Sequence, residues 1–136
     1  MDKITVTFIR ASFLYLLIGS TIGALLLFWP QAAGIYRSIH AHLNVFGWLS
    51  MMVFGVGYHI LPRFSGRPLH SKRLAWVHLY LSNLGLVGLA LFWAIAGYAG
   101  GGAMRLPLAI FGAILAISIY IFVYNMWRTV KGLGEK

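Results

Sequence analysis

Residues 37–62, RSIHAHLNVFGWLSMMVFGVGYHILP, decide the fold of this chain. The stretch begins with Arg37, ends with Pro62 and contains no acidic residue. A helix needs about 20 apolar residues to cross the hydrocarbon core of a bilayer. Lipid offers no partner to an unpaired backbone group, so such a segment must be helical. The stretch therefore predicts a transmembrane helix over residues 37–61, with Pro62 as its stop.

The composition of the whole chain agrees with a lipid environment. Of the 136 residues, 60% are hydrophobic and 10% are charged, whereas about 25% are charged in a typical soluble domain. The net charge is +9, but the basic residues flank the apolar runs, so we expect no nucleic-acid partner. The sequence has no cysteine, which excludes disulfides, thiolate metal sites, iron–sulfur clusters and covalently attached c-type haem.

Three further apolar runs complete the predicted architecture. They cover residues 6–29, 74–97 and 106–127. Pro30 ends the first run, the turn Gly100-Gly101-Gly102 follows the third, and Pro107 suits the first turn of the fourth. The first run is too long for a signal peptide, so we expect no cleaved leader. We predict an all-α membrane protein, with residues 1–136 forming one four-helix transmembrane bundle with short loops.

The basic residues predict the orientation of the bundle. They gather near the first run, between the second and third runs, and in the tail; these are Lys3, Arg10, Arg63, Arg67, Lys72, Arg73, Arg128, Lys131 and Lys136. By the positive-inside rule, both termini and the middle loop are cytoplasmic. We expect an integral protein of a prokaryotic inner membrane.

Four histidines lie within the predicted spans, and intramembrane histidines indicate function because they are costly in lipid and are common metal ligands. His40 and His42 lie near the outer face, and His59 and His78 near the inner face. His40 and His59 are nineteen residues apart, or about 28 Å along a helix, and cannot share a metal. His59 and His78 lie at matching depth on neighbouring helices, which predicts a haem held by two histidines.

Small residues near the inner pair would leave room for a porphyrin. Gly55 lies one turn from His59, and Ser82 and Gly85 follow His78 at helical spacing. Asn83 would orient a histidine or bond a partner helix. Close helix packing explains small residues equally well, as it does for Gly19-x-x-x-Gly23, and an interfacial histidine can simply be solvated.

The outer pair presents a choice, because residues two apart on a helix point about 200° apart. The stripe of His40 is small and polar and suits the bundle interior; it contains Asn44, Gly47, Met51 and Tyr58. The stripe of His42 is bulkier and predicts a face towards lipid or a second subunit; it contains Phe46, Leu49, Val53 and Val56. His40 is therefore the better ligand within the chain, and His42 would alternatively reach to the headgroups. The outer haem would be five-coordinate, or would take a methionine, a water or a ligand from another subunit.

The segments 36–43 and 57–63 resemble the second helix of haem–copper oxidase subunit I, most closely in the C-family oxidases and the nitric oxide reductase catalytic subunit. The first span, with residues 19–23 and its Trp29-Pro30 end, is similar to that family's first helix. The resemblance implies that His40, after Arg37, is a low-spin haem ligand; an alternative register through residues 41–44 places His42 there. The family's remaining ligands lie on later helices, so we expect no haem–copper site from this chain alone.

Together these features predict a membrane-embedded b-type haem protein, with one or two haems held by His40, His42, His59 and His78. Its role would be electron transfer or the binding of NO or O2, as a subunit rather than a stand-alone enzyme. Copper is the less favoured cofactor. A homodimer or a larger respiratory complex is expected, with a quinol or cytochrome as redox partner. The alternatives are a cofactor-free structural or assembly subunit, and a haem or copper carrier. Asp2 and Glu135 are the only acids, which excludes carboxylate acid–base pairs.

Overall fold

The computed structural model describes residues 1–99 and 102–131, and its regular elements are all helical. The elements are α1 (Lys3–Phe28), a 3-10 turn η1 (Pro30–Ala32), α2 (Ala33–His42), a π-helical segment η2 (Leu43–Ser50), α3 (Met51–Phe64), α4 (Lys72–Ala99) and α5 (Arg105–Val130). Four helical stretches are long and apolar enough to cross a membrane. The prediction of an all-α protein with four such helices is confirmed. Gly100 and Gly101 of the predicted turn, and Glu135 and Lys136 of the tail, lie outside the described residues.

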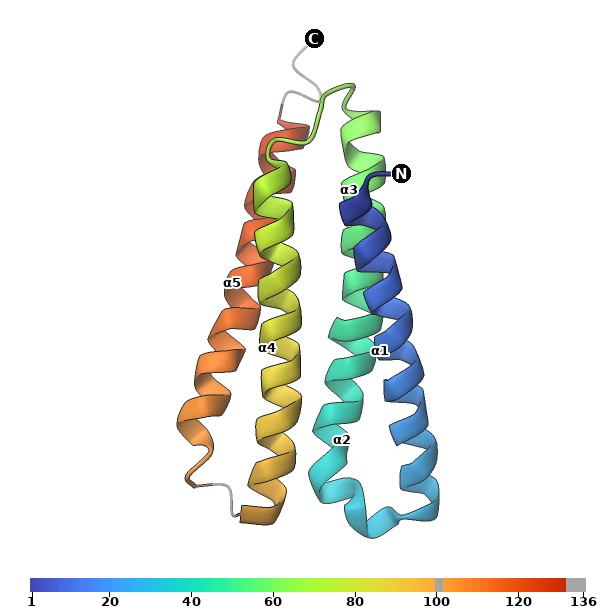
Figure 1. Cartoon of the computed structure of the whole chain (residues 1–136), viewed down its shortest axis with the longest axis vertical. Helices are drawn as coiled ribbons and strands as arrows, with labels where there is room; N and C mark the ends of the chain where they lie inside the picture. The colour runs from blue at the N-terminus through green and yellow to red at the C-terminus, as the bar shows by residue number, and fades with distance from the viewer. Residues whose placement is uncertain (100–101, 132–136) are drawn as a thin grey trace.

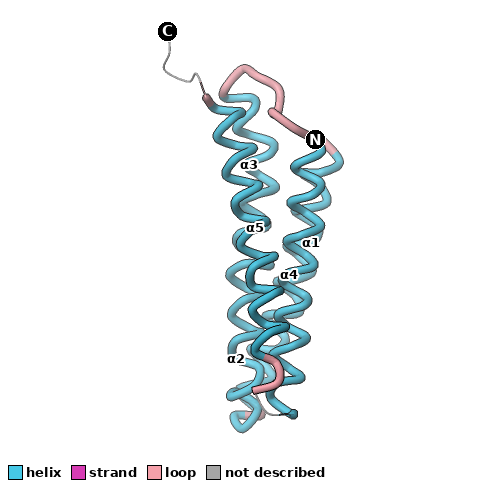
Figure 2. The backbone as a smooth tube through the Cα atoms, turned by 90° about the vertical axis from the view of Figure 1, so that its left-hand side faces the viewer, coloured by secondary structure: helices cyan, strands magenta, loops and turns pink. Residues whose placement is uncertain are grey.

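The helices form two antiparallel hairpins (Figure 1). The elements η1, α2, η2 and α3 join into one stretch, Pro30–Phe64, which we call the second span. The second span packs along α1, and α4 packs along α5, while α2 and α3 also contact α4 and α5 respectively. The start of α1, the α3–α4 loop and the end of α5 gather at one end of the bundle (Figures 1 and 2). The basic segments predicted to be cytoplasmic therefore lie together.

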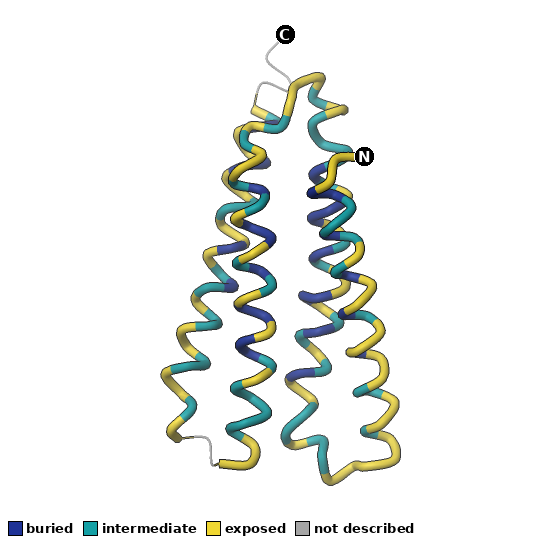
Figure 3. Tube along the Cα trace, viewed as in Figure 1, coloured by how far each residue is buried: buried dark blue, intermediate teal, exposed yellow. Residues whose placement is uncertain are grey.

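The outer surface of the bundle is apolar. Buried residues lie mainly on the sides of the helices that face one another (Figure 3). Large apolar side chains cover the outside, and Leu27 and Phe28 are 81% and 85% exposed. Such continuous apolar exposure is rare on soluble proteins and is typical of a surface solvated by lipid.

The second span is not a regular α-helix. Its central residues Leu43–Ser50 are wound as a π-helix, and Ser50 Oγ donates to the carbonyl of Val45 at 3.0 Å. Ile39 and Met51 are both buried, although twelve residues of a regular α-helix would turn them about 120° apart. The wider turns of the π-helix remove this angular difference between Ile39 and Met51. A uniform α-helical pattern therefore does not predict which residues of the two halves of the span are buried.

The end of the second span also differs from its prediction. Helix α3 continues through Pro62 to Phe64, and the N–H of Ser65 donates to the carbonyl of Leu61 at 3.0 Å. Pro62 removes one backbone bond, the one to Tyr58. Because it lies in the last turns, the helix continues for two more residues rather than stopping there.

The small residues expected to line a porphyrin pocket are used in helix packing instead. A Cβ on Gly55 would lie 3.0 Å from Cβ of Phe8 on α1, and a Cβ on Gly85 would lie 2.9 Å from the backbone nitrogen of Leu115 on α5. Ser82 Oγ donates to Ser118 Oγ at 3.1 Å. These positions bring helix backbones close together, so the packing interpretation is the correct one for them.

Candidate functional site

His78 lies at the centre of an aromatic cluster. It is fully buried, and its Nδ1 is 3.0 Å from the hydroxyl oxygen of Tyr58 on α3. Its ring centroid is 4.9 Å from that of Phe8, 4.7 Å from Phe54 and 5.4 Å from Phe122. Its Nε2 is buried and has no hydrogen-bond partner among the described residues. Three phenyl rings, from α1, α3 and α5, therefore surround the His78 ring.

His59 has different neighbours. Arg63, one turn later on α3, hydrogen-bonds to the His59 ring. His59 lines a cavity of about 460 Å³ at the end of the bundle, together with Thr5 and Lys72.

The predicted haem between His59 and His78 stays a prediction, because the structure shows the partners of the two rings and not whether they bind a haem. Tyr58, not its neighbour His59, is the α3 residue that hydrogen-bonds to His78. The matching depth was judged correctly, but one residue along a helix turns the side chain by about 100°.

His40 packs α2 against α1. Its Nδ1 is 2.8 Å from the carbonyl oxygen of Gly19, and a Cβ on Gly23 would lie 2.5 Å from its Cε1. Asn44 fills the space beside Gly19 and donates to the backbone carbonyl of His40 at 2.9 Å. The Gly19-x-x-x-Gly23 motif is therefore a packing motif, in which the side chain of Asn44 packs against Gly19 and the ring of His40 packs against Gly23. Since a carbonyl only accepts, Nδ1 carries the proton and Nε2 keeps a lone pair.

His42 faces the other hairpin. Its Nδ1 is 3.0 Å from the carbonyl oxygen of Ser38, and its ring centroid is 4.5 Å from that of Trp93 on α4, at 57°. The prediction that His42 faces lipid or a second subunit is therefore wrong. The π-helical segment begins at the next residue, so the outward stripe of Leu49, Val53 and Val56 does not extend back to His42.

A cavity of about 320 Å³ lies beside His42, between the second span and α5. Its other lining residues are apolar: Ala41, Val45, Phe46 and Leu115. The bond to Ser38 places the proton of His42 on Nδ1 and leaves a lone pair on Nε2. Histidines that bind a metal through one ring nitrogen usually donate the N–H of the other to a backbone carbonyl or a carboxylate. An imidazole beside an apolar cavity fits one face of a haem.

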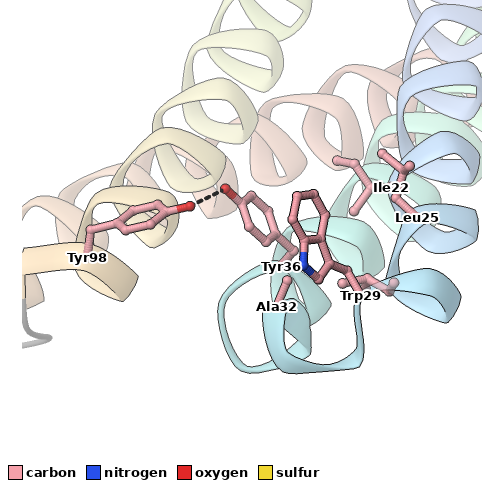
Figure 4. A pocket seen from close by; sticks show the side chains of 7 residues that line it. Ile22, Leu25, Trp29, Ala32, Tyr36 and Tyr98 are labelled. Atoms are coloured by element: carbon pink, nitrogen blue, oxygen red, sulfur yellow. Dashed lines mark hydrogen bonds between the residues drawn. The ribbon is translucent and has the colours of Figure 1, made fainter.

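A third cavity, of about 380 Å³, lies at the opposite end of the bundle from the termini and has no counterpart in the predictions. Its wall includes Ile22, Leu25, Trp29, Ala32, Tyr36 and Tyr98, and the hydroxyls of Tyr36 and Tyr98 lie 2.9 Å apart, joining α2 to α4 (Figure 4). Sequence reasoning missed this pair because Tyr98 belongs to no motif, and Tyr36 was considered only as part of segment 36–43. The only available signal was an aromatic residue near the end of each predicted span.

The donor set suits haem better than a bare metal ion. Within residues 1–99 and 102–131, no three histidine or acidic side chains gather into a metal-binding group. A bare ion takes several protein ligands, whereas haem iron can be held by one proximal histidine.

The chain is similar to three curated bacterial proteins. It is 29% identical to the Cbb3-type cytochrome c oxidase subunit CcoN1 of Stutzerimonas stutzeri, over 68% of this chain and 24% of that protein. It is 28% identical to cytochrome c oxidase subunit 1 of Rhodobacter capsulatus, over 67% of this chain and 22% of that protein. The cytochrome c oxidase subunit 1 homolog of Agrobacterium tumefaciens (strain T37) is 37% identical, over 43% of this chain and 11% of that protein.

The matches cover only a part of each relative. The chain spans about a quarter of the length of the first two and less of the third. No family model and no solved structure matches. The predicted resemblance is confirmed by these relatives, and the chain is an integral membrane protein with four membrane-spanning helices that is similar to a part of haem–copper oxidase subunit I.

Proposed function

We propose that the chain is a b-type haem protein of a bacterial inner membrane and that His42 is its iron ligand. The observation that carries this proposal is the position of His42, whose Nδ1 is bonded to Ser38 while its ring lines an apolar cavity. The resemblance to subunit I supports it, because that family binds haem, and one register of the resemblance places His42 at the ligand position.

The surroundings of His42 favour a flat apolar ligand. Small-molecule sites are mostly apolar, with a few polar groups that fix orientation. Here the polar group is the imidazole, and contact with Trp93 limits its rotation. A bound haem would supply a redox-active iron.

His40 is the second candidate ligand. Its Nδ1 is also bonded to a carbonyl, so its Nε2 has the same free lone pair. Its ring, however, is held against Gly19 and Gly23 and is needed to pack α1. We therefore assign His40 a structural role and His42 the role of ligand.

The proposed role is electron transfer or binding of a diatomic gas, within a larger complex. Helices α1 and α5 carry no histidine, and His78 of α4 lies fifteen residues from Trp93, the residue that contacts His42, or about 22 Å along the helix. A haem on His42 would therefore have one histidine from this chain. The other face would accept NO, O2 or a ligand from a partner. The relatives are oxidase subunits, which supports a respiratory complex; a quinol or a cytochrome would be the electron donor.

A cofactor-free structural subunit is the competing function, and one observation favours it. His78 and the small residues Gly55 and Gly85 serve packing. The inner half of the bundle can therefore be explained without any haem.

Absorption spectroscopy tests the proposal. The protein is purified after expression with added haem, and the haem-to-protein ratio is measured as the pyridine haemochrome. We expect about one haem per chain in the wild type and none in His42→Ala, with unchanged helicity by circular dichroism. His70→Ala is the matched control, because His70 lies in the α3–α4 loop. A colourless wild type would support the structural subunit, and haem retained in His42→Ala would exclude His42 as the ligand.

A further inference from the structure

The end of the bundle that holds the basic segments contains a polar cavity of about 460 Å³, which we call the headgroup cavity. It lies between the start of α1, the end of α3 and the start of α4. Its wall includes Asp2, Thr5, His59, Arg63 and Lys72. The haem proposal uses none of these residues.

The charges of the headgroup cavity are unbalanced. Lys72 Nζ lies 3.3 Å from Asp2 Oδ2, and this is the one ion pair in the part of the chain that the structure describes. Arg63 instead hydrogen-bonds to the His59 ring, so its guanidinium has no carboxylate partner among the described side chains. The cavity therefore favours an anion, since it holds two cationic side chains and one carboxylate.

A buried hydroxyl adds an independent sign of a ligand. Thr5 is fully buried, lines the same cavity, and its Oγ1 has no hydrogen-bond partner within the described chain. Two other threonines of α1 behave normally: Thr7 and Thr21 donate to the carbonyls of Lys3 and Leu17, each at 2.8 Å. Thr5 departs from this pattern at the wall of the cavity, where rotation about χ1 can direct its hydroxyl to a bound oxygen.

We propose that the headgroup cavity binds the phosphate group of an anionic phospholipid. The planar guanidinium of Arg63 suits phosphate oxygens, which it can bind through two parallel hydrogen bonds. His59 and Thr5 supply further donors. The cavity lies at the end predicted to be cytoplasmic, where anionic lipids attract basic segments and basic pockets between helices bind headgroups. Phe64, beside Arg63, is 77% exposed and offers an apolar surface for an acyl chain.

Native mass spectrometry of the detergent-solubilised protein tests the proposal. Phosphatidylglycerol, phosphatidylcholine and inorganic phosphate are titrated separately, and phosphate is also added as a competitor. We expect one phosphatidylglycerol per chain to bind at least about tenfold more tightly than phosphatidylcholine, and Arg63→Gln to remove this preference, since a charge-assisted hydrogen bond is worth a tenfold change or more. Competition by millimolar inorganic phosphate would identify a free-phosphate site and overturn the lipid proposal.

Two variants keep the test specific. Arg67→Gln is the matched control, because Arg67 lies four residues after Arg63, in the α3–α4 loop, but donates to the backbone carbonyl of Lys131 at 2.8 Å. It should leave lipid binding unchanged. Thr5→Val keeps the side-chain shape and should weaken binding by a few-fold through loss of one neutral hydrogen bond. Equal binding by the wild type, Arg63→Gln and Thr5→Val would overturn the proposal. Because the readout is bound lipid, the result is independent of haem content.

Discussion

The hydroxyl oxygen of Tyr58 lies 3.0 Å from Nδ1 of His78, so a buried hydrogen bond joins α3 to α4. The phenyl rings of Phe8 and Phe122, from α1 and α5, cover both partners. All four membrane-spanning stretches thus meet around this bond, which makes it a central contact of the inner half of the bundle.

Removal of the Tyr58 hydroxyl should destabilise the bundle. Tyr58→Phe leaves the Nδ1 of a buried histidine without a partner, which costs about 1–3 kcal/mol. The free energy of unfolding in mixed SDS micelles measures the effect. Tyr80→Phe is the control, because Tyr80 is 66% exposed. Equal stability of Tyr58→Phe and the wild type would show that the bond contributes nothing measurable.

Replacement of both partners should cost less than replacement of one. In Tyr58→Phe/His78→Leu no polar atom of the pair remains buried, and such double replacements can be nearly neutral. A double-mutant cycle with the two single variants gives the coupling, which we expect to be about 1–2 kcal/mol for groups in direct contact. Additive effects would argue against the bond. His78→Leu should also keep any haem spectrum, and loss of the spectrum would instead assign His78 as a ligand.

The contact of α1 with the second span should not tolerate a methyl group. A Cβ on Gly19 would lie 2.6 Å from Nδ2 of Asn44, and one on Gly23 would lie 2.5 Å from Cε1 of His40. Gly23→Ala should therefore destabilise the protein by about 1–3 kcal/mol through overpacking. Gly34→Ala is the matched control, because nothing lies within 4 Å of its added Cβ. A neutral Gly23→Ala would mean that His40 can move away without cost.

Asn125 should hold the α3–α4 loop in place. This buried residue of α5 accepts from the N–H of Ser71 at 3.0 Å through Oδ1 and donates to the carbonyl of Ser71 at 2.9 Å through Nδ2. Asn125→Ala leaves the N–H of Ser71 unpaired, at a cost of about 1–3 kcal/mol, while the carbonyl of Ser71 keeps the bond from the N–H of Ala75 at 3.3 Å. We expect faster tryptic cleavage after Lys72, the residue that follows Ser71.

Val123→Ala is the control for that experiment. Val123 is 51% exposed on the same helix, so its truncation should leave the cleavage rate unchanged. If Asn125→Ala and Val123→Ala are cleaved at the same rate, the loop does not depend on its bonds to Asn125.

The second span separates what the sequence predicts from what it does not. The helical state of residues 37–61 follows from hydropathy, because lipid forces each segment to satisfy its backbone groups locally. The depth of each histidine follows from the same count of residues. The π-helical segment Leu43–Ser50 leaves no mark in the apolar pattern, and it sets the directions of His42 and Met51. A uniform helical wheel therefore placed His42 on the wrong face.

By itself, then, the sequence determined that lipid surrounds the protein and that four helices span it. It also determined the depth of the polar side chains along these helices and the resemblance to oxidase subunit I. Only the tertiary structure decided which side chains contact one another. Asn83, which was predicted to orient a histidine or bond a partner helix, accepts a hydrogen bond from the hydroxyl of Tyr15 on α1 at 2.6 Å. His78 pairs with Tyr58 rather than with His59. The physical reason is that lipid solvates every apolar face of a helix equally. Rotation about the helix axis is therefore set by the packing of side chains from different helices, which no pattern along one segment contains.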